Sequence, residues 1–154
     1  VARIFNTYGP RMRPDDGRII PNFFIQGLQG QALSVYGEGS QTRSFCYVGD
    51  LVEGLYKLMR SSETAPVNIG NPVERKVGDL AKMVIALTGS RGGIKNLPFP
   101  ENDPKQRRPD ISRAKARLGW EPRVDFETGL AECLDHFRDE LKAAGGAIVT
   151  PTLS

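Results

Sequence analysis

Residues 3–12 read RIFNTYGPRM, and the interpretation of the whole chain starts from this stretch. The apolar run 1–5 is rich in β-branched and aromatic residues, which is typical of a short buried strand. Polar residues follow at once, and Gly9-Pro10 ends the strand. Because ligands of open parallel sheets bind at the carboxyl ends of strands, Asn6 is a candidate binding residue. The alternative is that Asn6 only caps its own turn.

Strand-like and helix-like segments alternate along the rest of the chain. Apolar residues at helical spacing predict helices at 19–28, 51–59, 80–87, 112–118 and 127–143. Short apolar runs predict further strands at 33–36, 43–48, 67–70 and 94–99. Asp50 and Ser112 are expected to cap the helices that follow them. The alternation predicts an α/β fold without a linker between independent domains, and we expect the tail 144–154 to be mobile.

Composition sets broad limits on the class of protein. The chain has 154 residues, of which 39% are hydrophobic and 25% charged, as in one globular domain or part of a larger one. A net charge of +3 suits anionic ligands without arguing for nucleic acid. Cys46 and Cys133 have no metal-ligand spacing and are expected to be reduced core thiols, which favours a cytoplasmic location. No run approaches the roughly 18 apolar residues of a membrane span.

Three other polar stretches are candidates for anion binding. Residues 37–43 form a glycine-rich loop that ends in Arg43, whose guanidinium suits phosphate oxygens; a plain hairpin turn is the alternative. Arg107 and Arg108 stand between prolines. Polyanion binding and an ordinary basic loop explain this stretch about equally well. The stretch 15–18 (DDGR) is most simply a turn before a helix.

Other features favour structural roles. His136 has no nucleophile beside it in the sequence, and Trp120 is expected to anchor a core. The basic residues of 113–117 fit a solvated helix face. A nucleic-acid-binding domain that uses these residues with Arg107 and Arg108 is disfavoured, because aromatic residues do not alternate with the basic ones.

Taken together, the stretches resemble one known family. They are RIFNTYGPRM, DDGRIIPNF, VYGEGSQTRSFCYVGDLVEGL, VNIGNP and RRPDISRAKARLGWEP. In this order they resemble the extended short-chain dehydrogenase/reductases that act on nucleotide sugars, the NAD-dependent epimerase/dehydratase family. The resemblance covers 1–141 and is nearest to the UDP-glucuronate decarboxylases. The dTDP-glucose 4,6-dehydratases and the sugar-nucleotide epimerases come next.

This resemblance implies the C-terminal part of an extended Rossmann fold with its small substrate-binding subdomain, over residues 1–143. The family's glycine-rich dinucleotide fingerprint and Tyr-x-x-x-Lys pair would precede residue 1, and no tyrosine of this sequence has a lysine four residues later. We therefore expect a fragment that binds a nucleotide sugar and is inactive alone. A non-catalytic UDP-sugar-binding module is the alternative.

The resemblance also implies a reaction and a site. NAD oxidises the sugar at C4, carbon dioxide leaves, and the returned hydride yields UDP-xylose; a full-length relative is expected to be a homodimer. Arg107 is implied to be catalytic, and Thr7 to lie near the NAD. The implied substrate-binding residues are Asn6, Arg18, Ile19, Asn22, Phe23, Tyr36, Gln41, Arg43 and Arg108. Lys76 stands where relatives place a helix-capping Ser or Thr, so that helix is expected either to start a little loosely or to be capped by Asp79.

Overall fold

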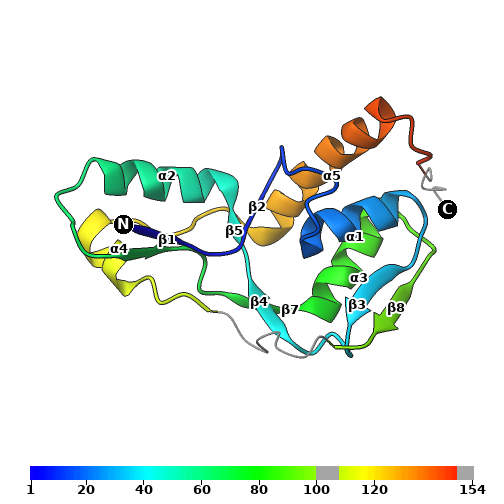
Figure 1. Cartoon of the computed structure of the whole chain (residues 1–154), viewed down its shortest axis with the longest axis horizontal. Helices are drawn as coiled ribbons and strands as arrows, with labels where there is room; N and C mark the ends of the chain where they lie inside the picture. Colours follow the sequence, from blue (N-terminus) through cyan, green and yellow to red (C-terminus); the bar gives the residue numbers. More distant parts are fainter. Residues whose placement is uncertain (100–107, 149–154) are drawn as a thin grey trace.

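A computed structural model describes residues 1–99 and 108–148 of the chain. Two lobes lie side by side in Figure 1, one around α2 and α4 and the other around α1 and α3. The helices are α1 (Ile19–Leu28), α2 (Val48–Met59), α3 (Val77–Thr88), α4 (Ser112–Leu118) and α5 (Phe126–Ala143). The predicted range 144–154 lies beyond the last helix, and its final residues, 149–154, are outside the described part.

The strands pair two by two, and each pair joins segments far apart in the sequence. Three pairs are parallel: β1 (Ala2–Ile4) with β6 (Val67–Ile69), β2 (Thr7–Tyr8) with β5 (Cys46–Tyr47), and β3 (Leu33–Tyr36) with β8 (Ile94–Leu97). The antiparallel pair is β4 (Thr42–Ser44) with β7 (Glu74–Lys76). Parallel strands connected through helices confirm the predicted α/β class.

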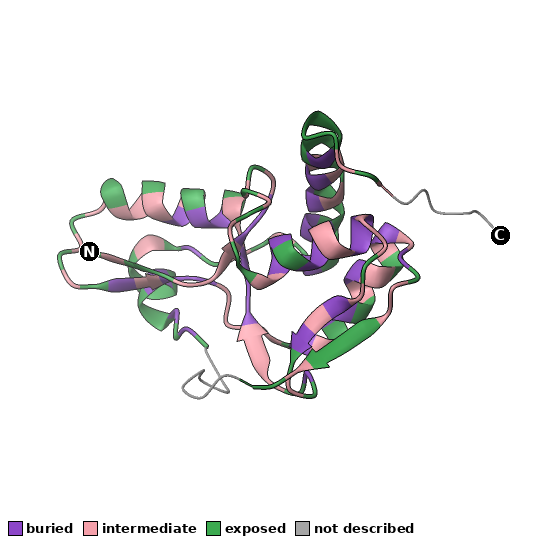
Figure 2. Ribbon diagram, turned by 45° about the vertical axis from the view of Figure 1, so that its right-hand side comes forward, coloured by how far each residue is buried: buried purple, intermediate pink, exposed green. Residues whose placement is uncertain are grey.

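Each lobe has its own apolar core. In the larger core, α1, α3 and α5 pack together, and the rings of Phe24 and Phe137 stack at 5.3 Å. The smaller core gathers apolar residues of β6, α2 and α4 around Trp120, whose Nε1 donates to the Asp50 carbonyl at 2.9 Å. Buried positions alternate with exposed ones along the helices, which confirms their predicted amphipathic character (Figure 2).

Several boundaries agree with the sequence expectations. The helix 19–28 and the strand 33–36 have the predicted bounds. The helix that ends before Gly89 closes with that glycine in the left-handed region, at φ 67°. His136 is a structural residue, as expected, because its Nε2 lies 3.0 Å from the Met12 carbonyl oxygen.

The predicted buried strand 1–5 and the predicted strand 43–48 are both wrong in part. Val1 and Ile4 are 75% and 57% exposed, because strand side chains point to the faces of a sheet and the described residues leave these two uncovered. The second strand breaks at Phe45, and Val48 already begins α2. An apolar run alone does not show where a strand turns into a helix.

The predicted caps Asp50 and Ser112 are wrong, and of the two expectations for α3 the start without a side-chain cap is the one found. The Ser112 backbone N–H donates to Asp110 Oδ1 at 2.8 Å, so the aspartate two residues earlier holds the start of α4. Asp79 forms an ion pair with Lys82 at 3.6 Å, and the N-cap of α3 has no side-chain bond. Asp50 lies inside the first turn of α2 and is buried there.

The helices of the described residues include none that has the length and apolar character to cross a bilayer.

Asp50 links the start of α2 to the segment that leads into α5. Its Oδ2 accepts the backbone N–H groups of Arg123 and Val124, both at 3.0 Å. Asp50→Ala removes this acceptor, and we expect it to lower the free energy of unfolding by about 1–3 kcal/mol for each amide left unpaired. Asp50→Asn keeps one acceptor oxygen and is expected to cost less than half as much. Denaturant titration of both variants measures this, with the exposed Glu140→Ala as control; equal losses in the two Asp50 variants would contradict it.

The two cysteines are free and buried, as predicted. Burial raises the pKa of both thiols from 9.0 to about 12. The folded chain therefore keeps these protons where the unfolded chain loses them, so the free energy of unfolding is expected to fall as pH rises from 9 toward 12. Iodoacetamide labelling at about pH 8 is expected to be far slower in the folded chain than in denaturant, since thiolate is the reactive form. Equal labelling rates in the two states would refute the burial of the thiols.

Candidate functional site

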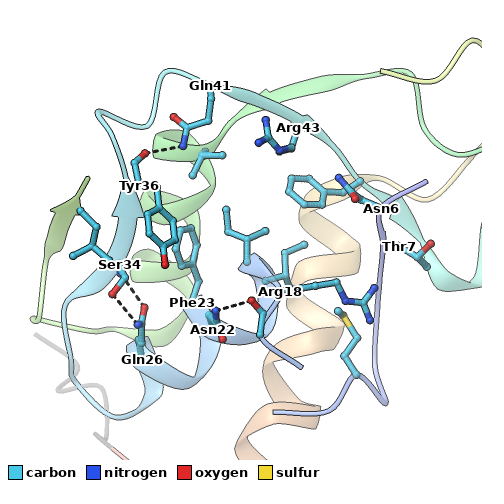
Figure 3. Close-up of a pocket in the computed structure, with 17 residues that line it drawn as sticks. Asn6, Thr7, Arg18, Asn22, Phe23, Gln26, Ser34, Tyr36, Gln41 and Arg43 are labelled. Atoms are coloured by element: carbon cyan, nitrogen blue, oxygen red, sulfur yellow. Dashed lines mark hydrogen bonds between the residues drawn. The ribbon is translucent and has the colours of Figure 1, made fainter. Parts of the chain in front are cut away.

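A cavity of about 400 Å³ lies where α1, β3, β4 and the end of β1 meet. This volume is within the range of small-molecule sites. Apolar side chains of Ile20, Phe23, Phe45, Val77 and Leu97 form much of its wall, and polar side chains reach in from several elements (Figure 3). The same cavity collects residues from positions 6 to 97 of the sequence.

One end of the pocket is built from α1 and β3. Parallel pairing with β8 uses the backbone groups of Leu33 and Gly37 and leaves those of Ser34 and Tyr36 on the other edge of β3. Side-chain amides meet that edge: Ser34 N donates to Gln26 Oε1 at 2.9 Å, and Gln41 Nε2 donates to the Tyr36 carbonyl at 2.8 Å. The half-exposed Tyr36 ring stands beside them.

Two guanidinium groups line the pocket from different elements, Arg43 near its middle and Arg18 on the side of Asn6 and Thr7 (Figure 3). Arg43 comes from β4, and its Nη1 donates to the Thr42 carbonyl at 2.8 Å. Arg18 comes from the turn before α1 and is held by Asp16 through Nε and through Nη2, the latter bond being 2.7 Å. This pairing lowers the pKa of Asp16, so the carboxylate stays ionised. The ion pair therefore holds the Arg18 guanidinium in a fixed position beside the pocket.

The other end of the pocket is formed by Asn6 and Thr7, which follow β1 (Figure 3). The Asn6 carbonyl accepts Cys46 N at 2.8 Å, so its backbone is fixed beside β5 while its side chain lines the pocket. The Thr7 hydroxyl donates to the Phe5 carbonyl at 2.9 Å. Asn6 therefore lines the cavity at the end of a parallel strand, where a binding residue was expected.

A second hollow adjoins this end. It has a volume of about 530 Å³ and shares Thr7, Met12 and Arg18 with the first pocket. Arg11 and Arg13 also line it. Arg11 holds a left-handed backbone conformation at φ 70°, which is uncommon for a residue other than glycine.

Nine of the eleven residues proposed from the sequence line the first pocket: Asn6, Thr7, Arg18, Ile19, Asn22, Phe23, Tyr36, Gln41 and Arg43. Arg108 lies elsewhere, in a hollow beside Pro72 and the start of α4. Arg107 is outside the described residues. Their roles remain predictions.

The sequence analysis missed Gln26 and Ser34. Gln26 lies one helical turn after Asn22, and Ser34 lies two residues before Tyr36 on the same face of β3. Helical and strand periodicity could have placed both beside residues that were already candidates.

A glycine is needed in the glycine-rich loop at position 39 because of a close backbone contact. Gly39 has φ 76°, and its carbonyl accepts Gly78 N at 2.9 Å. A Cβ atom on Gly39 would lie 2.9 Å from backbone atoms of Gly78. The close approach in this loop is therefore between two backbone segments, which holds Gln41 and Arg43 against the start of α3.

The parallel strand pairs, the covering helices and the polar pocket at strand ends define a Rossmann-type α/β ligand-binding protein. The chain belongs to the GDP-mannose 4,6-dehydratase family, which it matches over residues 1–133. This confirms the resemblance to NAD-dependent epimerases and dehydratases of nucleotide sugars.

The relatives include UDP-glucuronic acid decarboxylase 1 of Danio rerio, 53% identical over 142 residues, which cover 92% of this chain and 34% of the relative. UDP-glucuronic acid decarboxylase 3 of Arabidopsis thaliana is 52% identical over 138 residues, 90% of this chain and 40% of the relative. The chain thus spans little more than a third of the length of these relatives.

Among solved structures, an epimerase of Methanothermobacter thermautotrophicus has a TM-score of 0.87 at 32% identity, over 92% of this chain and 44% of that one. UDP-glucuronic acid 4-epimerase of Bacillus cereus, in complex with UDP-glucuronic acid and NAD, has a TM-score of 0.83 at 29% identity, over 90% and 45% of the two chains. The fold class is therefore that of the extended Rossmann epimerases.

Gly39→Ala tests whether the loop depends on its backbone contact. We expect it to lower the free energy of unfolding by about 1–3 kcal/mol more than Gly17→Ala does, because overpacking against Gly78 adds to the conformational cost. Gly17 is a matched control, with φ 79° and nothing within 4 Å of its Cβ position. Thermal or urea unfolding measures both variants. Equal losses would show that only the backbone conformation matters.

Proposed function

We propose that this chain is the nucleotide-sugar-binding part of an NAD-dependent UDP-glucuronate decarboxylase, which forms UDP-xylose. The observation that carries the proposal is the order of groups along the pocket. An aromatic and amide-lined end is followed by Arg43 and then by Asn6 and Thr7, with the Arg18 guanidinium on their side of the pocket. A nucleoside diphosphate sugar has the matching order of base, diphosphate and sugar.

The centre of the pocket suits the diphosphate. Arg18 and Arg43 can each offer charge-assisted hydrogen bonds, which are worth roughly 1.5–3 kcal/mol apiece. The N-terminus of α1 lies in the same wall and has no acidic residue in its first turn, so its dipole adds to the attraction. Binding energy from this remote part of the substrate would orient the sugar for reaction at C4.

The sugar end fits a site shared with a cofactor. The second hollow meets the pocket at Thr7 and Arg18, and its basic residues suit an anionic group. NAD, when bound, accepts hydride from the sugar and returns it. We propose that Thr7 borders NAD there, that the remainder of the NAD site belongs to a longer polypeptide, and that Asn6 holds the sugar.

The similarity to decarboxylases favours UDP-glucuronate over other sugar nucleotides, since the relatives with 52–53% identity carry that name. Loss of carbon dioxide from the oxidised sugar would also need a proton donor. Arg107, by resemblance, binds and protonates there, and Arg108 is its neighbour. A dehydratase or an epimerase part is the second candidate, supported by the epimerases among the solved structures. As in the family, we expect the complete enzyme to be a cytoplasmic homodimer.

Arg43→Gln tests the proposal. It removes one phosphate-binding cation, and we expect the Kd for UDP-glucuronate to rise roughly tenfold to a hundredfold, as the loss of a charge-assisted contact predicts. Isothermal titration calorimetry of the 154-residue chain measures it. Arg91→Gln removes the same charge from an exposed loop and is expected to leave the Kd unchanged. Equal affinities for wild type and Arg43→Gln would remove Arg43 from the site, and a wild-type chain that binds no nucleotide sugar would refute the function.

A further inference from the structure

One face of α5 contacts residues that line the second hollow. Glu132 and His136 are four residues apart on this helix, so their side chains lie on the same side of it. The Tyr47 hydroxyl donates to Glu132, and His136 Nε2 lies 3.0 Å from the Met12 carbonyl oxygen. Tyr47 and Met12 line the hollow, whereas Glu132 and His136 lie behind them. This face of α5 therefore supports the hollow from outside.

The direction of the His136 contact follows from its partner. A carbonyl oxygen can only accept, so Nε2 carries the hydrogen and donates it. The His136 ring is half-buried and stands beside Phe137, with ring centres 5.2 Å apart. Phe137 is buried and stacks on Phe24 of α1. The larger core therefore fixes the position from which His136 donates.

Met12 belongs to the loop 9–18, which runs from β2 to α1 and passes beside α5 (Figure 1). Met12 lines both the pocket and the second hollow. The residue before it, Arg11, has φ 70°, a conformation that residues other than glycine rarely adopt. Such a conformation persists where surrounding contacts maintain it. The hydrogen bond from His136 is a contact of this kind, because it holds the adjoining residue.

A short series of contacts leads from Met12 to the Arg18 guanidinium. The carbonyl of Arg13, the next residue, accepts Asp16 N at 3.2 Å. The Asp16 carboxylate then holds Arg18 through Nε and through Nη2, the latter at 2.7 Å. Each step is a covalent bond or a hydrogen bond, so the series is physically continuous. It connects a histidine outside the pocket with a cation that lines it.

We propose that His136 is a positioning residue: by donating to the Met12 carbonyl, it sets the conformation of the loop 9–18 and thereby the place of the Arg18 guanidinium. This inference rests on the proposed function, in which Arg18 lies nearer the sugar than Arg43 does. His136 itself touches no ligand. Its effect on affinity passes through the loop and is confined to ligands that reach Arg18.

Two ligands separate this effect from a general loosening of the fold. UMP has the base, the ribose and one phosphate, so in the proposed orientation it extends as far as Arg43. UDP-glucuronate adds the second phosphate and the sugar, which extend toward Arg18 and Asn6. A general loosening changes both dissociation constants by the same factor or changes neither. The ratio of Kd for UMP to Kd for UDP-glucuronate therefore reports the placement of Arg18.

His136→Leu removes the donor and keeps a side chain of similar size. By calorimetric titration of the 154-residue chain we expect the Kd for UDP-glucuronate to rise roughly threefold to tenfold, the effect of one weakened hydrogen bond, and the Kd for UMP to stay within about twofold. His136→Gln supplies an amide N–H in place of the imidazole N–H and is expected to restore the wild-type ratio. Ala131→Leu places the same leucine at an exposed position of α5 and is expected to leave both constants unchanged.

A double-mutant cycle tests the route through Arg18. If His136 acts on Arg18, His136→Leu has no further effect on the Kd for UDP-glucuronate in a chain that already carries Arg18→Gln. Two losses that multiply would overturn the proposed route. Asp16→Asn weakens the last step of the series without touching α5, and we expect it to lower the ratio as His136→Leu does. This variant keeps the proposal testable if the His136 variants do not fold.

The outcomes distinguish this inference from the proposed function. If the wild type binds UDP-glucuronate and the ratio is unchanged in both His136→Leu and Asp16→Asn, the positioning role is overturned and the proposed function stands. If the wild type binds neither UMP nor UDP-glucuronate, both are overturned.

Discussion

The structure depends on one short segment, residues 42–47, that belongs to both cores at once. Phe45 is buried in the larger core and the next residue, Cys46, in the smaller one. Successive side chains of an extended chain point in opposite directions, so one peptide unit can join two cores only if the backbone stays extended there. Pairing of β4 with β7 on one side and of β5 with β2 on the other holds it so. Arg43 and Asn6 meet in the pocket as a consequence, since each is attached to one of these pairings.

Much of the architecture could be predicted because its causes are local. Apolar spacing and a closing glycine were enough to predict the helix 19–28. A short alternating run was enough to predict the strand 33–36. Other features depend on partners elsewhere in the chain. The sequence suggests that the Asp50 carboxylate caps a helix. In the structure it accepts hydrogen bonds from the backbone N–H groups of Arg123 and Val124. The strand 1–5 looks buried, and the exposure of Val1 and Ile4 depends on which parts of the chain cover its two faces.

In the candidate site, too, some features follow from local sequence and others depend on distant parts of the chain. Each polar stretch was ambiguous alone, and only their combined resemblance to a family brought residues 6 to 43 into one hypothesis, which the pocket then gathered. Gln26 and Ser34 were missed because they lie outside the stretches 15–23 and 35–55 that carry the resemblance, although periodicity places them beside Asn22 and Tyr36. The basic face of α4 needed the structure too: Arg117 lies 3.6 Å from Glu63 and Lys115 lies 2.6 Å from Glu121, so these cations are paired with carboxylates. That pairing supports a solvated helix face.

A common property of the pocket's polar groups is that the protein already holds them. Asp16 holds Arg18, the Tyr36 carbonyl holds Gln41, and Gln26 and Ser34 hold each other. Within the described residues no buried side-chain nitrogen or oxygen lacks a partner. A ligand therefore meets groups whose rotamers are fixed before it arrives, and little side-chain entropy is lost on binding. The same fixation limits what can bind, because the positions of these groups are set before a ligand arrives. In this pocket, preorganisation and selectivity are consequences of the same hydrogen bonds.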